Sequence, residues 1–263
     1  MTAEVRAIGL LGPGIGSWAH GRTVLRGAAL YQPQLTVIPA SMALPPAERR
    51  RAIRTVNLAL AVGHEATVGV DIDLTKLCTV FASSGADCTN CHELLETLAT
   101  ADRQVSPTRF HNSVHNVAAG YWSIATRDTA SYTMVSAYDG SFSAGLVEAF
   151  SLVTSLRHSV LLIAYDMDYP GPLREVRPIP DAFGVALLLQ PSLGSGTMAQ
   201  LSLSFSDESP AEMHRPELES LRLSAPAARA MPLLELLAGG RAGVVRLEYL
   251  DNLSLSVTVT PCD

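Results

Sequence analysis

The sequence predicts an α/β fold in which a mixed central sheet is flanked by helices. Apolar runs of strand length alternate along the chain with longer segments whose apolar residues recur at helical spacing. Residues 132–165 contain a strand, an almost wholly apolar helix and a second apolar strand, which is the order of a parallel crossover unit. The closing strands 243–249 and 253–260 flank the turn residues Asp251 and Asn252, so antiparallel pairing is expected as well.

The amino-acid composition excludes several classes of protein. Of the 263 residues, 48% are hydrophobic and 17% are charged, a balance that excludes intrinsic disorder, collagen and a coiled coil. We expect one domain over residues 1–263. The net charge of -6 argues against nucleic-acid binding, which needs clustered Lys and Arg, and Lys76 is the only lysine. We find no apolar run long enough for a membrane span and no signal peptide, and we expect a cytoplasmic protein with reduced cysteines.

The N-terminal elements follow from apolar spacing and from turn residues. Val5–Leu11 is an apolar strand, and Gly12–Gly16 (GPGIG) forms a tight turn that leads into a helix over Trp18–Leu30. A glycine turn before a helix is also compatible with phosphate binding, but the acidic residue expected about 20 positions downstream in the dinucleotide fingerprint is missing. Two prolines then open a helical stretch that continues over 49–68.

The middle of the chain adds a strand over 78–83 and two helices. The first helix covers 91–101, and its apolar residues at helical spacing are Leu94, Leu95 and Leu98. The second helix covers 113–125 and combines small residues with two aromatic ones. This combination is typical either of a subunit interface or of a tight core, and the sequence alone does not choose between them.

The rest of the chain is richer in strands. The helix over 141–157 leaves little polar surface and must be buried, and the strand over 159–165 is almost wholly apolar, as central parallel strands covered on both faces are. Further predicted elements are strands over 182–189 and 199–205 and a helix over 232–238. The polar stretch Ser206–Pro226 contains three prolines and is expected to be a mobile loop.

Two sets of residues admit a metal-binding interpretation beside a structural one. Cys88–His92 (CTNCH) matches the pattern of covalent haem attachment, yet no export signal is found and no second cysteine pair completes a zinc site, so a helix N-terminus is the structural alternative. The pairs Asp71/Asp73 and Asp166/Asp168 have the oxygen ligands that divalent ions use, although solvated loop carboxylates are more common. We therefore expect no metal and no cofactor.

The segment Gly140–Gly145 (GSFSAG) lies between a strand and a helix, as the nucleophile elbow of serine hydrolases does. The G-x-S-x-G pattern around Ser143 requires a glycine at the position of Ser141, so the register fails. Hydrolysis by Ser141 or Ser143, with His111 or His115 as the base, is kept as an alternative.

One run of motifs resembles a known family. Residues 106–110 (SPTRF), 113–124 (SVHNVAAGYWSI) and 135–141 (VSAYDGS) resemble the N-terminal half of the β-ketoacyl synthases, and residues 8–12 (IGLLG) and 81–85 (FASSG) match in order. The resemblance covers about residues 4–190 and implies a thiolase-like fold, mainly its N-terminal half. The run from SVHN to SIA is most similar to short ketosynthase-like proteins of aryl polyene and related type II fatty-acid or polyketide pathways, which act as chain-length-factor-type partners.

The resemblance places the family's catalytic cysteine, at the N-terminus of the buried helix, on Asp139, or on Tyr138 with a shift of one residue. No cysteine stands there, and a carboxylate is a poor acyl nucleophile; helix capping is the expected role of Asp139. The two histidines and the lysine that the family takes from its C-terminal half are also missing, because only His214 and no lysine follow Asp166. The resemblance therefore implies a chain that does not condense acyl groups.

A non-catalytic partner subunit is the function that this resemblance implies. The chain is expected to form a heterodimer with a full-length ketosynthase and to meet an acyl carrier protein through that complex. Residues 112–126 and 132–137 would form the interface. The side chains expected at the interface or over the partner's acyl tunnel are His115, Asn116, Tyr121, Trp122, Tyr138 and Phe142. The alternatives are a stand-alone thioesterase or malonyl decarboxylase, and a homodimeric scaffold that binds a carrier protein.

Overall fold

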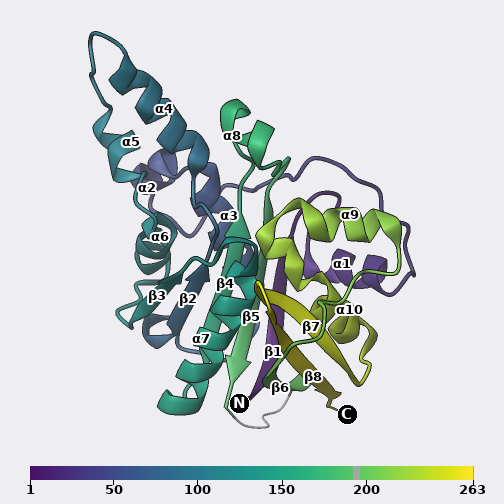
Figure 1. The fold of residues 1–263 in the computed structure, drawn as a ribbon. Coiled ribbons are helices and arrows are strands. Elements are labelled where there is room, and N and C mark those ends of the chain that lie inside the picture. Colours follow the sequence, from purple (N-terminus) through teal and green to yellow (C-terminus); the bar gives the residue numbers. More distant parts are fainter. Residues whose placement is uncertain (192–195, 263) are drawn as a thin grey trace.

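A mixed sheet forms the centre of the computed structural model, which describes residues 1–191 and 196–262 (Figure 1). Across the sheet the order is β3 (Tyr132–Val135), β2 (Cys78–Ala82), β4 (Val160–Asp166), β5 (Phe183–Gln190), β1 (Thr2–Leu11), β6 (Ala199–Ser206), β8 (Leu253–Pro261) and β7 (Gly243–Leu250). β2 runs parallel to β3 and to β4, and every other neighbouring pair is antiparallel. The predicted mixed sheet is thereby confirmed.

Helices cover both faces of the sheet, because side chains alternate between its faces along each strand. In β4, Leu161 and Ile163 pack into the core beneath α3 (Arg54–Glu65) and α6 (Val117–Thr126). Leu162 packs on the opposite face against α7 (Ser141–Leu156), and the same core takes in α1 (Trp18–Leu25) and α10 (Met231–Gly239). β4 is therefore buried on both faces, as predicted, although only its β2 side is a parallel pairing.

The crossover predicted over 132–165 is confirmed. α7 connects β3 to β4, and these two strands flank β2 on its two sides. The remaining helical elements are α2 (Pro46–Arg51), α4 (Cys88–Ala99), α5 (Pro107–His111), α8 (Gly171–Val176), α9 (Pro216–Ser224) and the 3-10 turns η1 (Leu74–Lys76), η2 (Tyr138–Gly140) and η3 (Pro226–Ala230). α4 and α5 form an arm that projects from the body of the molecule (Figure 1).

Three predicted helical or loop boundaries were wrong. The helix expected over 49–68 is two helices, because Ala52 and Ile53 adopt extended backbone between α2 and α3. The helix expected over 18–30 ends at Leu25, just before Gly27 with φ +72°. The segment expected to be a mobile loop contains α9, whose first residue is a proline and which buries Leu218 and Leu221.

The GPGIG segment is a tight turn, as predicted. Gly12 and Ile15 exchange two backbone hydrogen bonds of 2.9 Å, and Gly14 takes the left-handed conformation with φ +66° that favours glycine. Within the described residues, none of the helices combines the length and apolarity needed to cross a bilayer.

β3 and β7 form the two edges of the sheet. β3 carries no charged residue, and the ring of Tyr132 on it is partly exposed. Thus one long side of β3 has no strand partner within the described chain.

Candidate functional site

The turn between β3 and α7 carries the position that the resemblance assigns to the catalytic cysteine. Asp139 stands there, and Tyr138 is the alternative one residue earlier. Tyr138 has φ +52°, a left-handed conformation that is uncommon for a non-glycine residue, and its ring is exposed. The Ser141 hydroxyl accepts a hydrogen bond from Ala137 N (3.0 Å) and donates one to Tyr138 O (2.7 Å). The chain therefore makes a sharp elbow that turns the side chain of residue 138 outward.

Gly140 fits this elbow because the backbone of β7 lies directly against it. A Cβ atom at residue 140 would lie 2.1 Å from the carbonyl oxygen of Tyr249, well inside van der Waals contact. At Gly120 on α6, no atom of the described residues lies within 4 Å of such a Cβ atom. Residue 140 thus has to be glycine for the elbow to pack on β7.

Gly140→Ala is expected to lower the free energy of unfolding by about 2 kcal/mol, because overpacking against rigid backbone forces the elbow away from β7. The matched control is Gly120→Ala, which is expected to raise stability by about 0.5–1 kcal/mol through helix propensity alone. Urea unfolding of the two variants measures both changes. Equal stabilities for the two variants would contradict the packing argument.

Asp139 does not cap α7, so the capping role predicted for it is wrong. The N-cap residue of α7 is Gly140, with no side-chain capping bond. The Asp139 carboxylate instead accepts a hydrogen bond from Arg177 Nη2 at 2.6 Å and lies 3.7 Å from Arg229 Nη2. These arginines come from segments distant in sequence, one after α8 and one in η3, and their charges attract the carboxylate more strongly than the helix end does.

Arg177 and Arg229 extend the ion pair into a network across the elbow. The guanidinium carbon of Arg177 lies 3.4 Å from the centroid of the Tyr138 ring, a cation–π contact. Arg229 also lies 3.3 Å from the carboxylate of Glu248 on β7. Both arginine side chains are largely buried, so the pair with Asp139 is shielded from solvent and holds the elbow to the C-terminal segments.

Asp166, at the end of β4, forms a second polar centre close to the elbow. Its carboxylate accepts hydrogen bonds from Ser84 N (2.9 Å), Ser84 Oγ (2.8 Å) and Ala227 N (2.8 Å). Burial raises the pKa of Asp166 to about 6, against the opposing effect of those donors and of Arg177. Asp166 therefore joins the ends of β2 and β4 to η3.

The expectation of solvated carboxylates holds for one aspartate pair and fails for the other. Asp71 and Asp73 are exposed, and Asp73 accepts the N-terminal hydrogen bond of η1. Asp166 is 1% exposed, while Asp168 lies 2.9 Å from Arg54 in an ion pair. Among the described residues we find no group of three or more His, Cys, Asp or Glu side chains placed to hold a metal ion.

The CTNCH motif begins α4, with Asp87 as its N-cap. Burial raises the pKa of the Cys88 thiol and of the Cys91 thiol. Cys88 lies near the second polar centre, where its Sγ donates to Gly85 O at 3.4 Å. Because the thiolate is disfavoured, Cys88 is not an activated nucleophile.

The serines and histidines of the hydrolase alternative are not joined by a hydrogen bond anywhere in the described chain. The Ser141 hydroxyl is hydrogen-bonded to the backbone of the elbow, and the Ser143 hydroxyl is buried with no hydrogen-bond partner among the described residues. His111 packs edge-on against Tyr121, and Nε2 of His115 is buried without a partner.

Three of the predicted interface residues are core residues instead. Tyr121 and Trp122 are each 1% exposed and Phe142 is fully buried, so these side chains do not lie on the surface of this chain. Trp122 packs beside His64 at a ring distance of 5.2 Å, against Gly63 of α3, where the absence of a side chain leaves room for the indole.

The other predicted interface residues lie at the surface. Asn116 is exposed and its side-chain amide donates to the Tyr132 hydroxyl on β3 at 2.9 Å. Tyr138 is 64% exposed, and His115 is half-buried. The structure thus brings Asn116 to the free edge of the sheet, and it leaves Tyr138 at the elbow.

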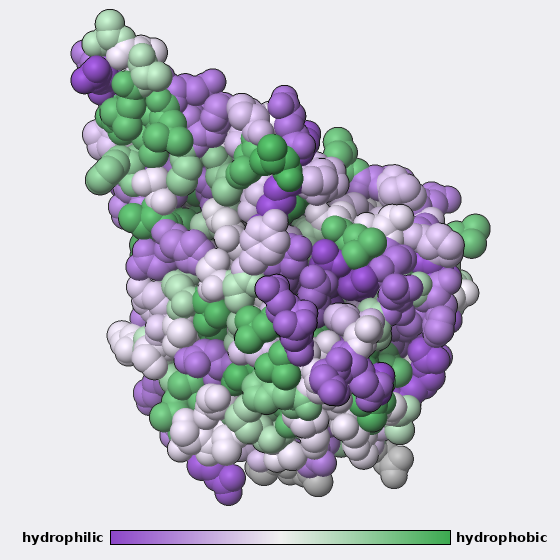
Figure 2. Space-filling view, in the orientation of Figure 1, coloured by the Kyte–Doolittle hydropathy of each residue, from purple (hydrophilic) through white to green (hydrophobic). Residues whose placement is uncertain are grey.

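The arm bears an apolar surface that the sequence analysis missed. Leu95 and Leu98 on α4 and Phe110 on α5 are exposed, and we call these three residues the arm patch. Figure 2 shows hydrophobic side chains gathered over α4 and α5. The sequence placed the three α4 leucines at helical spacing, and of these only Leu94 is buried. In the structure α5 has only five residues, which are too few to cover the twelve residues of α4.

Comparison with known proteins identifies the family to which the sequence is similar. Residues 25–246 match the model of the β-ketoacyl synthase N-terminal domain. No curated protein matches the sequence significantly. The solved structures that resemble the chain include the ketosynthase ApeO in complex with its chain length factor ApeC from Xenorhabdus doucetiae, at 22% identity and a TM-score of 0.74, with 98% of this chain and 99% of that chain covered.

Two further structures have the same fold. The ishigamide ketosynthase/chain length factor matches with 14% identity, a TM-score of 0.76 and full coverage of both chains. A type II polyketide acyl-carrier protein in complex with its ketosynthase, AntDE:AntF, matches with 9% identity, a TM-score of 0.76 and 99% coverage of each chain. These identities establish the thiolase-like fold alone. Because the family model spans most of the sequence, this chain belongs to the β-ketoacyl synthase N-terminal domain family.

Proposed function

We propose that this chain is a chain-length-factor-type subunit, which pairs with an active ketosynthase, does not itself condense acyl groups and shapes the acyl tunnel of its partner. The proposal includes contact with an acyl carrier protein through that complex. It is supported by the family match and by similar structures whose titles name ketosynthases with a chain length factor or a carrier protein.

The observation that carries the proposal is the chemistry of the elbow. The residues at the position assigned to the nucleophile are Tyr138 and Asp139, and the Asp139 carboxylate is paired with two arginines. A carboxylate held in this way is a weak nucleophile, since its negative charge is neutralised by the guanidiniums that bind it. No cysteine of the chain lies between residues 92 and 261, so the elbow has no thiol to take up an acyl group.

The surface proposed for the ketosynthase combines the free edge of β3 with the arm patch. β3 has no strand on its outer side within the described residues, and the Asn116–Tyr132 pair lies beside it. Exposed large apolar side chains such as those of the arm patch are typical of interaction sites. Since Trp122 and Phe142 are buried in this chain, the tunnel-shaping contacts are assigned instead to exposed side chains of the arm patch.

Assays of the chain alone and in complex test the proposal. Incubated alone with malonyl and acyl thioesters, the purified chain is expected to form no carbon–carbon bond, because the elbow has no thiol. Co-produced with a ketosynthase, it is expected to co-elute as a heterodimer that extends acyl chains. Liquid chromatography with mass spectrometry measures the products in both cases.

Three outcomes would reject this function. Hydrolysis by the isolated chain that is lost in Ser141→Ala or Ser143→Ala would establish the thioesterase alternative. Malonyl decarboxylation by the isolated chain would establish the decarboxylase. A stable homodimer that binds a carrier protein but no ketosynthase would establish the scaffold.

A further inference from the structure

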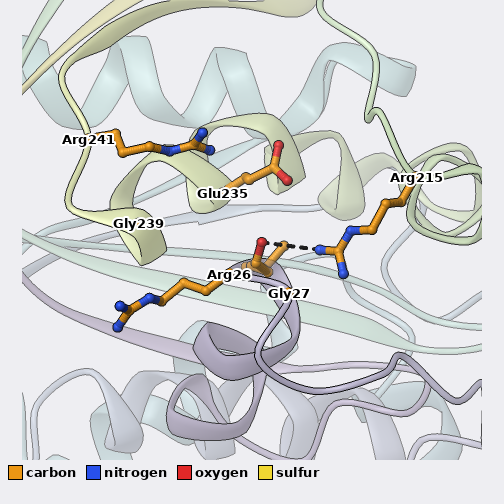
Figure 3. Close-up of a pocket in the computed structure, with 7 residues that line it drawn as sticks. Arg26, Gly27, Arg215, Glu235, Gly239 and Arg241 are labelled. Atoms are coloured by element: carbon orange, nitrogen blue, oxygen red, sulfur yellow. Dashed lines mark hydrogen bonds between the residues drawn. The ribbon is translucent and has the colours of Figure 1, made fainter.

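A cavity of about 380 Å³ lies between the ends of α1 and α10, away from the elbow and on the other side of the molecule from the arm (Figures 1 and 3). We call it the arginine pocket. Its lining residues are Leu25, Arg26, Gly27, Arg215, Glu235, Gly239 and Arg241. Its volume is within the range of about 300–1,000 Å³ that small-molecule sites occupy.

The arginine pocket is a positively charged site on a negatively charged protein. Three guanidinium groups line it, and Glu235 is the only carboxylate in its lining, whereas the whole chain carries a net charge of -6. Figure 3 shows Glu235 on the same side of the pocket as Arg241, with Arg26 at the opposite wall. Neither Arg26 nor Arg241 takes part in an ion pair within the described ranges, and Glu235 has none there either.

One of the three arginines binds the carbonyl groups at a helix end, and the other two do not. Helix C-termini attract cations because their last carbonyl groups carry partial negative charge. Arg215 already serves α1, since its Nη2 donates to Val24 O at 2.8 Å and to Leu25 O at 3.1 Å. At the end of α10 the backbone itself supplies donors, from Gly240 N to Leu237 O and from Arg241 N to Leu236 O. The guanidiniums of Arg26 and Arg241 therefore remain available to a ligand.

We propose that the arginine pocket binds a phosphate monoester. A phosphate dianion matches the two available guanidiniums in charge, and each guanidinium has paired N–H groups that suit phosphate oxygens. The pocket is larger than a phosphate needs, so the site also accommodates an organic group. Glu235 is placed to accept a hydrogen bond from a hydroxyl or amide of that group, and it disfavours a second anionic group.

Calorimetric titration of the full-length chain tests the proposal with inorganic phosphate, glycerol 3-phosphate and glycerol. Glycerol 3-phosphate is expected to bind more tightly than inorganic phosphate, and glycerol is expected not to bind. Arg26→Gln and Arg241→Gln are each expected to raise the Kd by about tenfold, the effect of losing a charge-assisted hydrogen bond. Glu235→Gln is expected to lower the Kd for inorganic phosphate, because a repulsive charge is removed.

The control variant is Arg50→Gln, since Arg50 is exposed on α2 and has no ion-pair partner among the described residues. It is expected to leave phosphate binding unchanged. Stronger binding of inorganic phosphate than of glycerol 3-phosphate would show that the pocket binds the free ion, and would overturn the proposal that its ligand is a phosphate monoester. Absence of phosphate binding, or an equal loss of phosphate affinity in Arg50→Gln and Arg26→Gln, would overturn the binding site. The arginines of the pocket would then only neutralise the partial negative charge of the helix C-termini.

Discussion

Asp166→Ala is expected to lower the free energy of unfolding by about 3 kcal/mol at pH 7, which is the largest stability change that we expect from a single substitution. The variant leaves the part-buried N–H group of Ser84 and the buried N–H group of Ala227 without an acceptor, and an orphaned buried group costs about 1–3 kcal/mol. Urea unfolding followed by circular dichroism measures the change. The control is Asp71→Ala, since Asp71 is exposed, and it is expected to change stability by less than about 0.5 kcal/mol.

The difference in stability between the wild type and Asp166→Ala is expected to depend on pH. Burial raises the pKa of Asp166 from 3.8 to about 6, so ionisation of this carboxyl costs more in the folded than in the unfolded chain. The stability that protonated Asp166 contributes is complete below pH 4 and is lost as the pH rises through 6. Between pH 7 and pH 5 the wild type is therefore expected to gain about 1 kcal/mol relative to Asp166→Ala. A stability difference that stayed constant over this interval would contradict the assignment.

Leu95→Asp and Phe110→Asp are each expected to weaken the complex with the ketosynthase by at least about 100-fold, because an unpaired carboxylate buried in an apolar interface costs several kcal/mol. Both side chains are more than 60% exposed, so the isolated variants are expected to fold as the wild type does. Titration of the chain against immobilised ketosynthase measures the Kd, and thermal unfolding verifies the fold.

Leu223→Asp is the matched control for these two variants. Leu223 is 51% exposed on α9, away from the arm, and it tests whether any new surface charge weakens the complex. Its Kd is expected to equal that of the wild type. If Leu95→Asp and Phe110→Asp also bound as tightly as the wild type, the arm patch would not be part of the interface.

The central sheet and α7 could be predicted because local patterns suffice for them. β4 is a run of apolar residues with polar segments at both ends, and α7 repeats its apolar residues at helical spacing. α9 was missed because it is short, is opened by a proline and buries few side chains, so its sequence resembles a loop. In that segment tertiary packing supplies the stability that local propensity does not.

The details of the candidate site depended on contacts between distant segments. The buried state of Asp166 is set by Ser84 and Ala227, which lie 82 and 61 residues away along the chain. The role of Trp122 was ambiguous for the same reason. Its sequence neighbourhood fits a core or an interface, and only the packing of α6 on Gly63 decides for the core. The position of Asp139 came from the family resemblance, but its two arginine partners could not be inferred from sequence spacing.

The two edges of the sheet differ in a way that limits how these molecules assemble. β7 bears Arg246, which pairs with Glu208, and Glu248, and its register against β8 shifts between Leu247 and Leu250. Charges and irregular register discourage strand addition, whereas β3 lacks both. If the proposed partner joins at β3, we expect the sheet to take up one neighbour only, which favours closed pairs over open-ended filaments.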